Sequence, residues 1–276
     1  LINDFIKAER PVLMIGAGVK HSDALPEFRE LAKTLKIPCY PTWNALDVVT
    51  SDFEYYCGRI GTYGGGIGRN FGIQNSDLLI GIGTRISGRI TGGNVTSFAR
   101  EAKKYVVDVD APMLQPHDQQ VQFDENIYCD AKVFMRLLMK KLSDKVSDKQ
   151  YSSPFDIKSK WLNKCLEWKN NYDPVKDVIE SNVLSESKYV HPYLFFRELS
   201  LQLENNAVLI GDCGGNIVAS NHSVLTKYGQ LNLTNNGNSP MGFSHAASMG
   251  CYLADPSRQV VCTIGDGGFN MNIQEL

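Results

Sequence analysis

The sequence TIGDGGFNMNIQEL, residues 263–276, contains residue types that suit a phosphate and a metal ion. Gly265, Gly267 and Gly268 allow the backbone to turn tightly and to approach a ligand closely. Asp266 adds one fixed carboxylate, which is a ligand type that Mg²⁺ prefers. A strand followed by a glycine turn and a helix N-terminus binds phosphate. The sequence therefore predicts a phosphate and magnesium site here, with Asp266 as a simple helix cap as the alternative.

A second turn of the same kind precedes it, at residues 211–215, with the sequence GDCGG. Ligands of open parallel sheets bind beyond the carboxyl ends of the strands. If the strands before Asp212 and Asp266 are neighbours, two sets of backbone N–H groups face one anion. That arrangement predicts a diphosphate site with a divalent ion between the diphosphate and Asp266.

Three glycine-rich turns in the first half of the chain are weaker candidates. The turns at residues 16–18 and 81–83 follow apolar runs, and each either binds phosphate or only joins a strand to a helix. The sequence GAGVKH at the first turn lacks the third glycine of a dinucleotide-binding fingerprint. The sequence GTYGGGIGRN, residues 61–70, is either a phosphate-binding backbone nest or a plain loop.

Strands and helices that alternate along the chain would position these turns. Apolar runs that end in glycine or aspartate are typical of buried parallel strands, and apolar residues at helical spacing lie between them. The predicted strands are 11–18, 37–43, 76–85, 104–114, 207–216 and 258–268, and the predicted helices are 24–36, 131–142, 160–172, 191–203 and 241–254. This order predicts an α/β protein with two doubly wound parallel-sheet (Rossmann-like) domains, the second incomplete.

The expected domain boundaries follow from composition. Residues 1–145 form the first domain and residues 187–276 the front part of the second. Residues 146–186 begin with a polar stretch without a sustained apolar period, which predicts a linker with one short helix. The chain starts without Met and ends at Leu276 without a helix stop signal, so we expect it to be a piece of a longer polypeptide.

Composition excludes several classes of protein. The chain has 276 residues, a net charge of −2 and scattered Lys and Arg, so no basic surface for nucleic acid is predicted. No apolar run approaches the roughly 20 residues that a membrane-spanning helix needs. The seven cysteines contain no C-x-x-C pair, which predicts reduced thiols in a cytoplasmic protein.

The motifs together resemble a known family. IGDGGFNMNIQEL is similar to the start of the thiamine diphosphate motif, and its NIQEL ending is most similar to acetolactate synthase and its relatives. PMGFSHAASMGCYLADPSRQVV resembles the helix and strand that precede this motif, and VLIGDCGGN resembles the diphosphate turn. RPVLMIGAG, SDLLIGIGTRISGRITG and VVDVDAPML resemble the central domain. The likeness covers nearly the whole chain.

The resemblance implies roles for residues of the second domain. Asp266 would hold Mg²⁺, while Gly267 and Gly268 would donate backbone N–H groups to the diphosphate of the cofactor. From the other strand the same group would be bound by Gly214, Gly215 and Asn216.

The resemblance also implies contacts to the two rings of the cofactor. Met241 would lie between the thiazolium and pyrimidine rings and impose the bent cofactor conformation, with a core Met as the alternative. The carbonyl of Ser239 and the N–H of Met241 would hold the aminopyrimidine. Ser239–Pro240 stands where the family has a glycine-containing sequence.

The activity implied by the resemblance is a thiamine diphosphate-dependent decarboxylase or carboligase that acts on a 2-oxo acid such as pyruvate. The activating Glu and a second metal ligand would lie outside residues 1–276, and the protein would be a homodimer or homotetramer. The central domain would bind FAD, ADP or no ligand, and Arg85 lies at a position that matches the FAD site of the family's central domain. The rival hypothesis is a flavin- or nucleotide-binding module of the doubly wound class.

Overall fold

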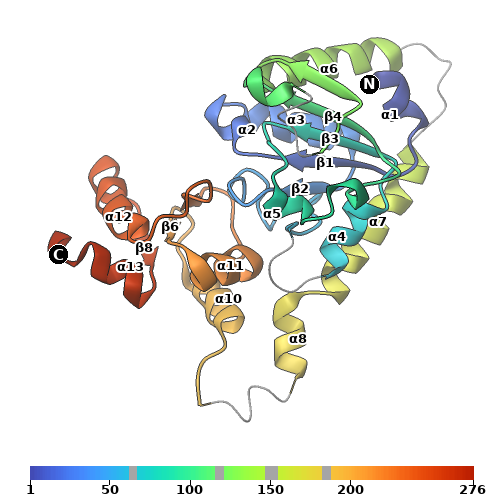
Figure 1. Cartoon of the computed structure of the whole chain (residues 1–276). Helices are drawn as coiled ribbons and strands as arrows, with labels where there is room; N and C mark the ends of the chain where they lie inside the picture. Colours follow the sequence, from blue (N-terminus) through green and yellow to red (C-terminus); the bar gives the residue numbers. More distant parts are fainter. Residues whose placement is uncertain (62–66, 116–120, 147–154, 182–187) are drawn as a thin grey trace. The chain divides into compact units, whose positions relative to one another are not determined.

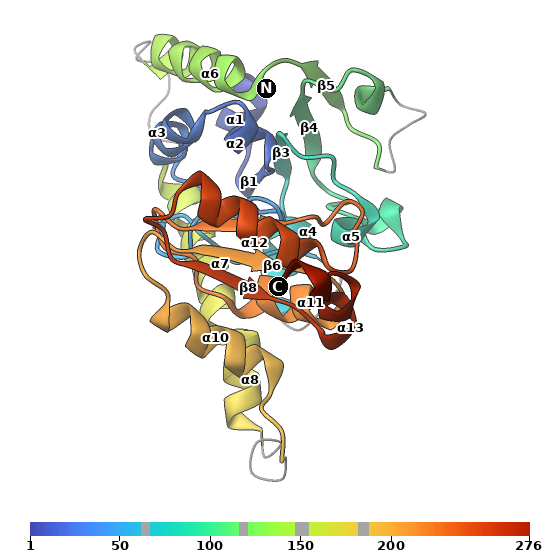
Figure 2. The same cartoon turned by 90° about the vertical axis from the view of Figure 1, so that its left-hand side faces the viewer.

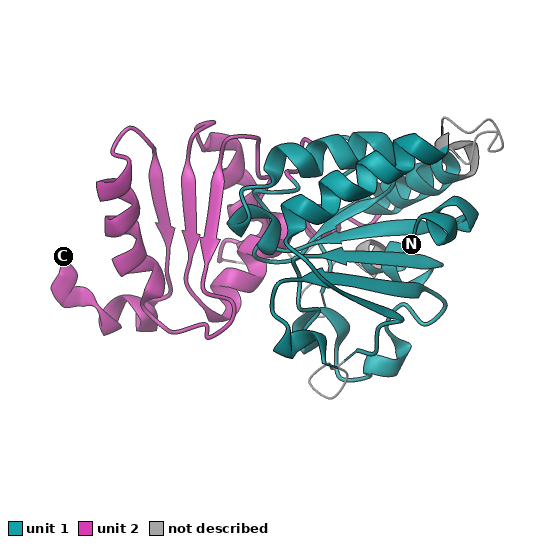
Figure 3. Cartoon of the chain, turned by 90° about the horizontal axis from the view of Figure 1, so that it is seen from above, with its two compact units in different colours: residues 1–49, 54–62, 67–171 teal, residues 50–53, 63–66, 172–276 magenta. Residues whose placement is uncertain are grey.

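The computed structural model describes residues 1–61, 67–115, 121–146, 155–181 and 188–276 (Figure 1). The described residues divide into two compact units (Figure 3). Unit 1 contains Leu1–Val49, residues 54–61 and Ile67–Asn171, and unit 2 contains Thr50–Phe53 and Tyr172–Leu276. The centre of the predicted GTYGGGIGRN loop, residues 62–66, lies outside the described residues.

Unit 1 is built on a five-stranded parallel sheet with the order β2-β1-β3-β4-β5. Figure 2 shows β1, β3, β4 and β5 side by side across this sheet. Because β1 lies between β2 and β3, the chain reverses its direction of winding there, which is the usual ligand-binding edge of such sheets. The strands are β1 Pro11–Ile15, β2 Cys39–Pro41, β3 Leu78–Ile82, β4 Lys103–Asp108 and β5 Glu125–Tyr128.

Helices cover both faces of this sheet (Figure 1). One layer contains α1, α3 and α6, and α4 and α7 form the other. The helices and short 3-10 turns of unit 1 are α1 Ile2–Lys7, α2 Gly18–His21, α3 Leu25–Leu35, α4 Ile67–Gln74, α5 Gly88–Thr91, η1 Val95–Ser97, η2 Pro112–Leu114, α6 Ala131–Val146 and α7 Phe155–Asn171. Apolar side chains buried on both faces explain why the central strands β1 and β3 are almost continuously hydrophobic.

Helix α7 packs in unit 1, although it falls within the predicted linker. Trp161 and Cys165, one turn apart on α7, are buried in the same core cluster as Val12 and Met14 of β1. Its neighbour along the chain, α8 Pro174–Glu180, belongs to unit 2. The partition into 1–145, 146–186 and 187–276 stays a prediction.

Unit 2 is built on a three-stranded parallel sheet with the order β7-β6-β8. Figure 2 shows α12 on one side of this sheet and α10 with α11 on the other. The further elements of unit 2 are β6 Val208–Gly211, β7 Leu231–Thr234, β8 Val260–Thr263, α10 Pro192–Gln202, α11 Gly214–Ser223, α12 Phe243–Ala254, α13 Asp266–Met271 and η3 Ile273–Glu275. The two helix-covered parallel sheets confirm the predicted α/β class with doubly wound domains.

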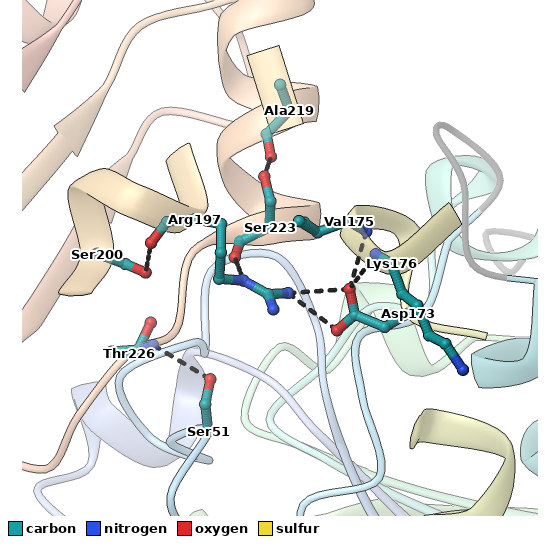
Figure 4. A network of polar contacts seen from close by, with 9 residues as sticks. All are labelled: Ser51, Asp173, Val175, Lys176, Arg197, Ser200, Ala219, Ser223 and Thr226. Atoms are coloured by element: carbon teal, nitrogen blue, oxygen red, sulfur yellow. Dashed lines mark hydrogen bonds and ion pairs between the residues drawn. The ribbon is translucent and has the colours of Figure 1, made fainter. Parts of the chain in front are cut away.

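A network of polar contacts fixes the end of α11 (Figure 4). The guanidinium of Arg197 on α10 donates to both carboxylate oxygens of Asp173, at 3.2 and 2.9 Å, and to the carbonyl of Ser223, at 2.8 Å. The N–H of Ser51 donates to the carbonyl of Thr226, and the N–H of Thr226 donates to the Ser51 hydroxyl, which adds the segment Thr50–Phe53 to the same unit. These contacts hold the C-terminal end of α11 in place, and therefore also orient its N-terminus.

None of the helices in the described ranges combines the length and the apolar character that a membrane span requires.

Candidate active site

The two strand-glycine-aspartate turns are side by side in unit 2. Strands β6 and β8 pair in parallel, and Gly211 lies opposite Thr263. The connection through α11 leads from β6 to β7 on one side, and α12 leads back to β8 on the other face. The carboxyl ends of β6 and β8 are therefore the switch point of this sheet, where ligands of such folds bind.

The turn after β6 leaves open space in front of α11. Gly214 has φ +64, and a Cβ on Gly214 or Gly215 would meet no atom within 4 Å. The first N–H groups of α11 have no partner within the helix and point out of its N-terminus. Asn216 connects the two turns, because its Oδ1 accepts a hydrogen bond from Thr263 Oγ1 at 3.2 Å. This end of the site can bind an anion through the backbone.

The turn after β8 places a free carboxylate beside that space. Asp266 is exposed at the first position of α13, and within the described ranges its side chain takes part in no hydrogen bond or ion pair. A Cβ on the preceding Gly265 would also meet nothing within 4 Å. The carboxylate of Asp266 is therefore available for a cation.

The turn before α12 brings Met241 to the same place. The Met241 side chain is 47% exposed, and a Cβ on Gly267 would lie 2.6 Å from Met241 Cε. Ser239 has φ +49, a left-handed conformation that favours glycine, so the departure from a glycine-containing sequence carries backbone strain here. The structure thus brings Ser239, Met241 and Gly267 into one region with Asp266.

Asp212 has a different environment from Asp266, despite the similar sequence around it. Its side chain is buried and faces inward, with Oδ2 3.1 Å from the N–H of Gly242 and Oδ1 3.0 Å from the N–H of Ser244. Burial and the neighbouring Asp212 carboxylate raise the pKa of the Cys213 thiol, which stays protonated and donates to Asp212 Oδ2 at 3.5 Å. Asp212 therefore binds the protein's own backbone.

The glycine turns at residues 16–18 and 81–83 of unit 1 are closed by each other. A Cβ on Gly16 would overlap the carbonyl of Gly83, and a Cβ on Gly18 would lie 2.6 Å from Gly83 Cα. The N–H of Gly16 donates to Ile82 O and that of Gly18 to Gly83 O, at 2.9 and 3.1 Å. These glycines allow two turns to pack against each other, which favours the structural alternative over phosphate binding at these N–H groups.

Two family models match this chain. The model described as "Thiamine pyrophosphate enzyme, central domain" matches residues 2–138, and "Thiamine pyrophosphate enzyme, C-terminal TPP binding domain" matches residues 212–276. The chain belongs to the thiamine pyrophosphate enzyme family. Thiamine pyrophosphate is another name for thiamine diphosphate, so the predicted resemblance is confirmed.

Curated relatives of this thiamine pyrophosphate enzyme are acetolactate synthase large subunits. The chain is 30% identical over 275 residues to the probable acetolactate synthase large subunit of Methanococcus aeolicus, covering 98% of this chain and 44% of that protein. It is 31% identical over 277 residues to the corresponding protein of Methanocaldococcus jannaschii, with 98% and 43% covered. It is 30% identical over 275 residues to the acetolactate synthase isozyme 2 large subunit of Escherichia coli (strain K12), with 98% and 44% covered. The chain spans less than half the length of these relatives.

The residues at the switch point fit the cofactor of thiamine pyrophosphate enzymes. Open glycines and helix N–H groups suit its diphosphate. A single exposed carboxylate suits Mg²⁺, which binds through one or two carboxylates, phosphate oxygens and water. Within the described residues no group of three or more His, Cys, Asp and Glu side chains could hold a metal ion, so the diphosphate itself would have to complete such a site.

The sequence indicated Asp212 but not its role, and it did not indicate Ser244 and Asn272, which also shape the site. Asn272 donates to the carbonyl of Gly242, next to Met241. Ser244 donates to Asp212, which also accepts from the N–H of Gly242. The GDCGG sequence was a signal for Asp212, but its similarity to GDGG gave no indication that one carboxylate faces inward and the other outward. For Ser244 and Asn272 no pattern in a single sequence indicates the contact.

Proposed function

We propose that the protein is a thiamine diphosphate- and Mg²⁺-dependent decarboxylase or carboligase of the acetolactate synthase type, which acts on a 2-oxo acid such as pyruvate. The observation that carries the proposal is the pair of open turns after β6 and β8, which lie side by side at the switch point of unit 2. The match of residues 212–276 to the family's cofactor-binding domain and the names of the relatives support it.

The two turns would divide the binding of the cofactor between them. The backbone N–H groups of Gly214, Gly215 and Asn216 would donate to the diphosphate at the N-terminus of α11. Gly267 and Gly268 would donate from the start of α13, and Asp266 would hold the Mg²⁺ that offsets the charge of the diphosphate.

The turn before α12 would orient the rings of the cofactor. Met241 would support the bent conformation with its flexible thioether side chain, and Ser239 O with Met241 N–H would hold the aminopyrimidine. When bound, thiamine diphosphate supplies the carbanion chemistry by which a 2-oxo acid loses CO₂. The part of this chain is to fix the geometry, on which such reactions depend strongly.

The test is turnover of pyruvate by the full-length protein with thiamine diphosphate and Mg²⁺. Acetolactate as the main product would support a carboligase, and acetaldehyde a simple decarboxylase. Chelation of Mg²⁺ and omission of the cofactor are the controls, and each should abolish turnover. Calorimetric titration that detects no binding of thiamine diphosphate with Mg²⁺ would contradict the proposal.

A further inference from the structure

The peptide groups that flank Gly242 are held from two sides by side chains of different elements. Asp212 Oδ2, after β6, accepts from the N–H of Gly242 at 3.1 Å. Asn272 Nδ2, after α13, donates to the carbonyl of Gly242 at 2.8 Å. We call this pair, Asp212 and Asn272, the Gly242 clamp. Hydrogen bonds at both polar groups leave this residue little freedom to rotate.

The second oxygen of Asp212 extends the same contact to the start of α12. Oδ1 accepts from the N–H of Ser244 at 3.0 Å and from its hydroxyl at 3.2 Å. Asp212 therefore caps the N-terminus of α12 from outside the helix, where Gly242 at the N-cap position has no side chain to do so. A carboxylate is well suited to this place because the helix dipole favours negative charge there.

Gly242 is the residue that this clamp requires. It has φ +87, and a Cβ there would lie 2.7 Å from Asn272 Nδ2 and 3.1 Å from the carbonyl of Gly268. A side chain would therefore separate the turn from α13. The close approach ties together three segments, those after β6, before α12 and in α13.

Met241 is the residue next to this clamped position, and its own packing does not fix it. Its side chain is 47% exposed, so few neighbours restrain it. The described contact is the approach of Met241 Cε to Gly267 on α13. The place of Met241 therefore depends on the backbone that follows it.

We propose that Asp212 and Asn272 are positioning residues that hold Gly242 and thereby place Met241 over Gly267. This inference rests on the proposed function, in which Met241 orients the cofactor. Neither side chain needs to touch the cofactor, and both act through the backbone of the turn before α12.

The first test uses the cofactor-free protein and hydrogen–deuterium exchange. Asp212→Asn keeps the size of the side chain but turns one acceptor into a donor that faces N–H groups. We expect the amides of Gly242 and Ser244 to exchange about tenfold faster, as for loss of a hydrogen bond to a charged group. The amides of β6 and β8 should keep their protection.

Asn272→Asp is the complementary substitution. It replaces the amide group that donates to the carbonyl of Gly242 by a carboxylate, which can only accept. Repulsion between the new carboxylate and this carbonyl should move Gly242 away from Asp212 Oδ2 and accelerate exchange at Gly242. Ser244 should stay protected, because Asp212 Oδ1 still caps α12. Asp255→Asn is the matched control: this carboxylate follows the other end of α12 and accepts hydrogen bonds only from Ser257 among the described residues. It should leave exchange at both amides unchanged.

The second test separates binding from turnover. The turns around Gly214 and Asp266 stay intact in Asn272→Asp, so the calorimetric affinity for thiamine diphosphate with Mg²⁺ should change less than about threefold. The kcat should fall at least about tenfold, since small misplacements of reacting groups are costly. Addition of the cofactor should not restore the wild-type exchange rate at Gly242.

Wild-type exchange at Gly242 in Asp212→Asn and Asn272→Asp would overturn the inference. If Asp212→Asn does not fold, exchange and kcat in Asn272→Asp decide alone. A wild-type protein that neither binds thiamine diphosphate nor turns over pyruvate would contradict the proposed function, while exchange in the cofactor-free protein would still support or overturn the clamp.

Discussion

Asp212 and Asp266 follow neighbouring parallel strands in turns of similar sequence, but their carboxylates bind different partners. Asp212 is buried, and its oxygens accept hydrogen bonds from the start of α12. Asp266 is exposed and, in the described part of the chain, has no partner. Because a carboxylate that already accepts several hydrogen bonds is poorly placed for a cation, Asp266 is the better metal ligand of the two.

Replacement of Asp266 by Ala should strongly weaken cofactor binding. The diphosphate would lose the ion that offsets its charge, and we expect the affinity for thiamine diphosphate with Mg²⁺ to fall by about 100-fold, the usual effect of removing a charge-assisted interaction. Calorimetric titration measures this change. Asp255→Ala is the control and should bind as the wild type does. An undiminished affinity in Asp266→Ala would remove this residue from the site.

The adjacent glycines Gly267 and Gly268 should differ in their tolerance of a methyl group. A Cβ on Gly268 would overlap Asp212 Oδ2 and lie 3.2 Å from the backbone N of Gly242. On Gly267 it would meet only Met241 Cε, the far end of a flexible side chain. Gly268→Ala should therefore lower the free energy of unfolding by about 1–3 kcal/mol, the usual cost of overpacking, and Gly267→Ala by less than about 1 kcal/mol.

Urea unfolding of both glycine variants checks this difference. Equal losses of stability in Gly267→Ala and Gly268→Ala would mean that Asp212 is free to move away from Gly268. That result would also weaken the role that we give to Asp212 beside Gly242.

At the scale of elements, the strands that could be predicted from the sequence are those with a clear apolar run. Strands β1, β3, β4, β6 and β8 are apolar runs that end in glycine or aspartate, and all lie within the predicted ranges or one residue from them. Strands β5 and β7 were not predicted. The sequence ENIY of β5 is mostly exposed and LNLT of β7 only partly buried, so neither has the apolar run that marks a central strand.

Placement of the elements could not be predicted from local patterns. The helix around Trp161 and Cys165 was expected, but its burial in the core of unit 1 depends on contacts distant in sequence. The turns at Gly16 and Gly214 look alike as sequences, whereas one is filled by the backbone of Gly83 and the other is open. The difference depends on which strands pair with each other, and this pairing cannot be predicted from the local sequence.

The contact between α8 and α10 should stabilise unit 2 measurably. Asp173 caps α8 through the N–H of Val175 at 2.8 Å and also pairs with Arg197, and its side chain is 30% exposed. Asp173→Asn keeps an oxygen that can cap α8, because Asn and Asp are similar N-caps, but it removes the ion pair, so we expect a loss of about 1 kcal/mol in the free energy of unfolding.

The matched control for Asp173→Asn is Glu180→Gln on the same helix. Glu180 forms an exposed pair with Lys176 at 3.7 Å, which should contribute at most about 0.5 kcal/mol. Urea unfolding followed by a probe in unit 2 measures both variants. Equal stability of the two would show that the contacts of Asp173 do not hold α8 to α10.

At the scale of the whole molecule, the two units give opposite predictions for the rival functions. Each unit has its own parallel sheet with helices on both faces and its own core. The open turns belong to unit 2, whereas Gly16, Gly18 and Gly83 in the described glycine turns of unit 1 donate their N–H groups to neighbouring backbone. A thiamine diphosphate enzyme should therefore bind its cofactor through unit 2, whereas a flavin- or nucleotide-binding module should bind through the switch point of unit 1. FAD in the first unit stays a prediction.

Cofactor binding should protect unit 2 selectively. A ligand that binds only the native state stabilises it by about 2.7 kcal/mol when its concentration is 100 times its Kd. This added stability applies to the unit that contains the binding site, because unfolding of that unit destroys the site. Hydrogen–deuterium exchange with thiamine diphosphate and Mg²⁺ should slow at β6, α11, β8 and α13, while β1 and β3 exchange as before. Asp266→Ala should abolish the protection, which separates the site from binding elsewhere on unit 2.

Parallel titrations with FAD and ADP test unit 1. Protection of β1 and β3 by either nucleotide, without any protection of unit 2 by thiamine diphosphate, would contradict the proposed function and favour the binding module.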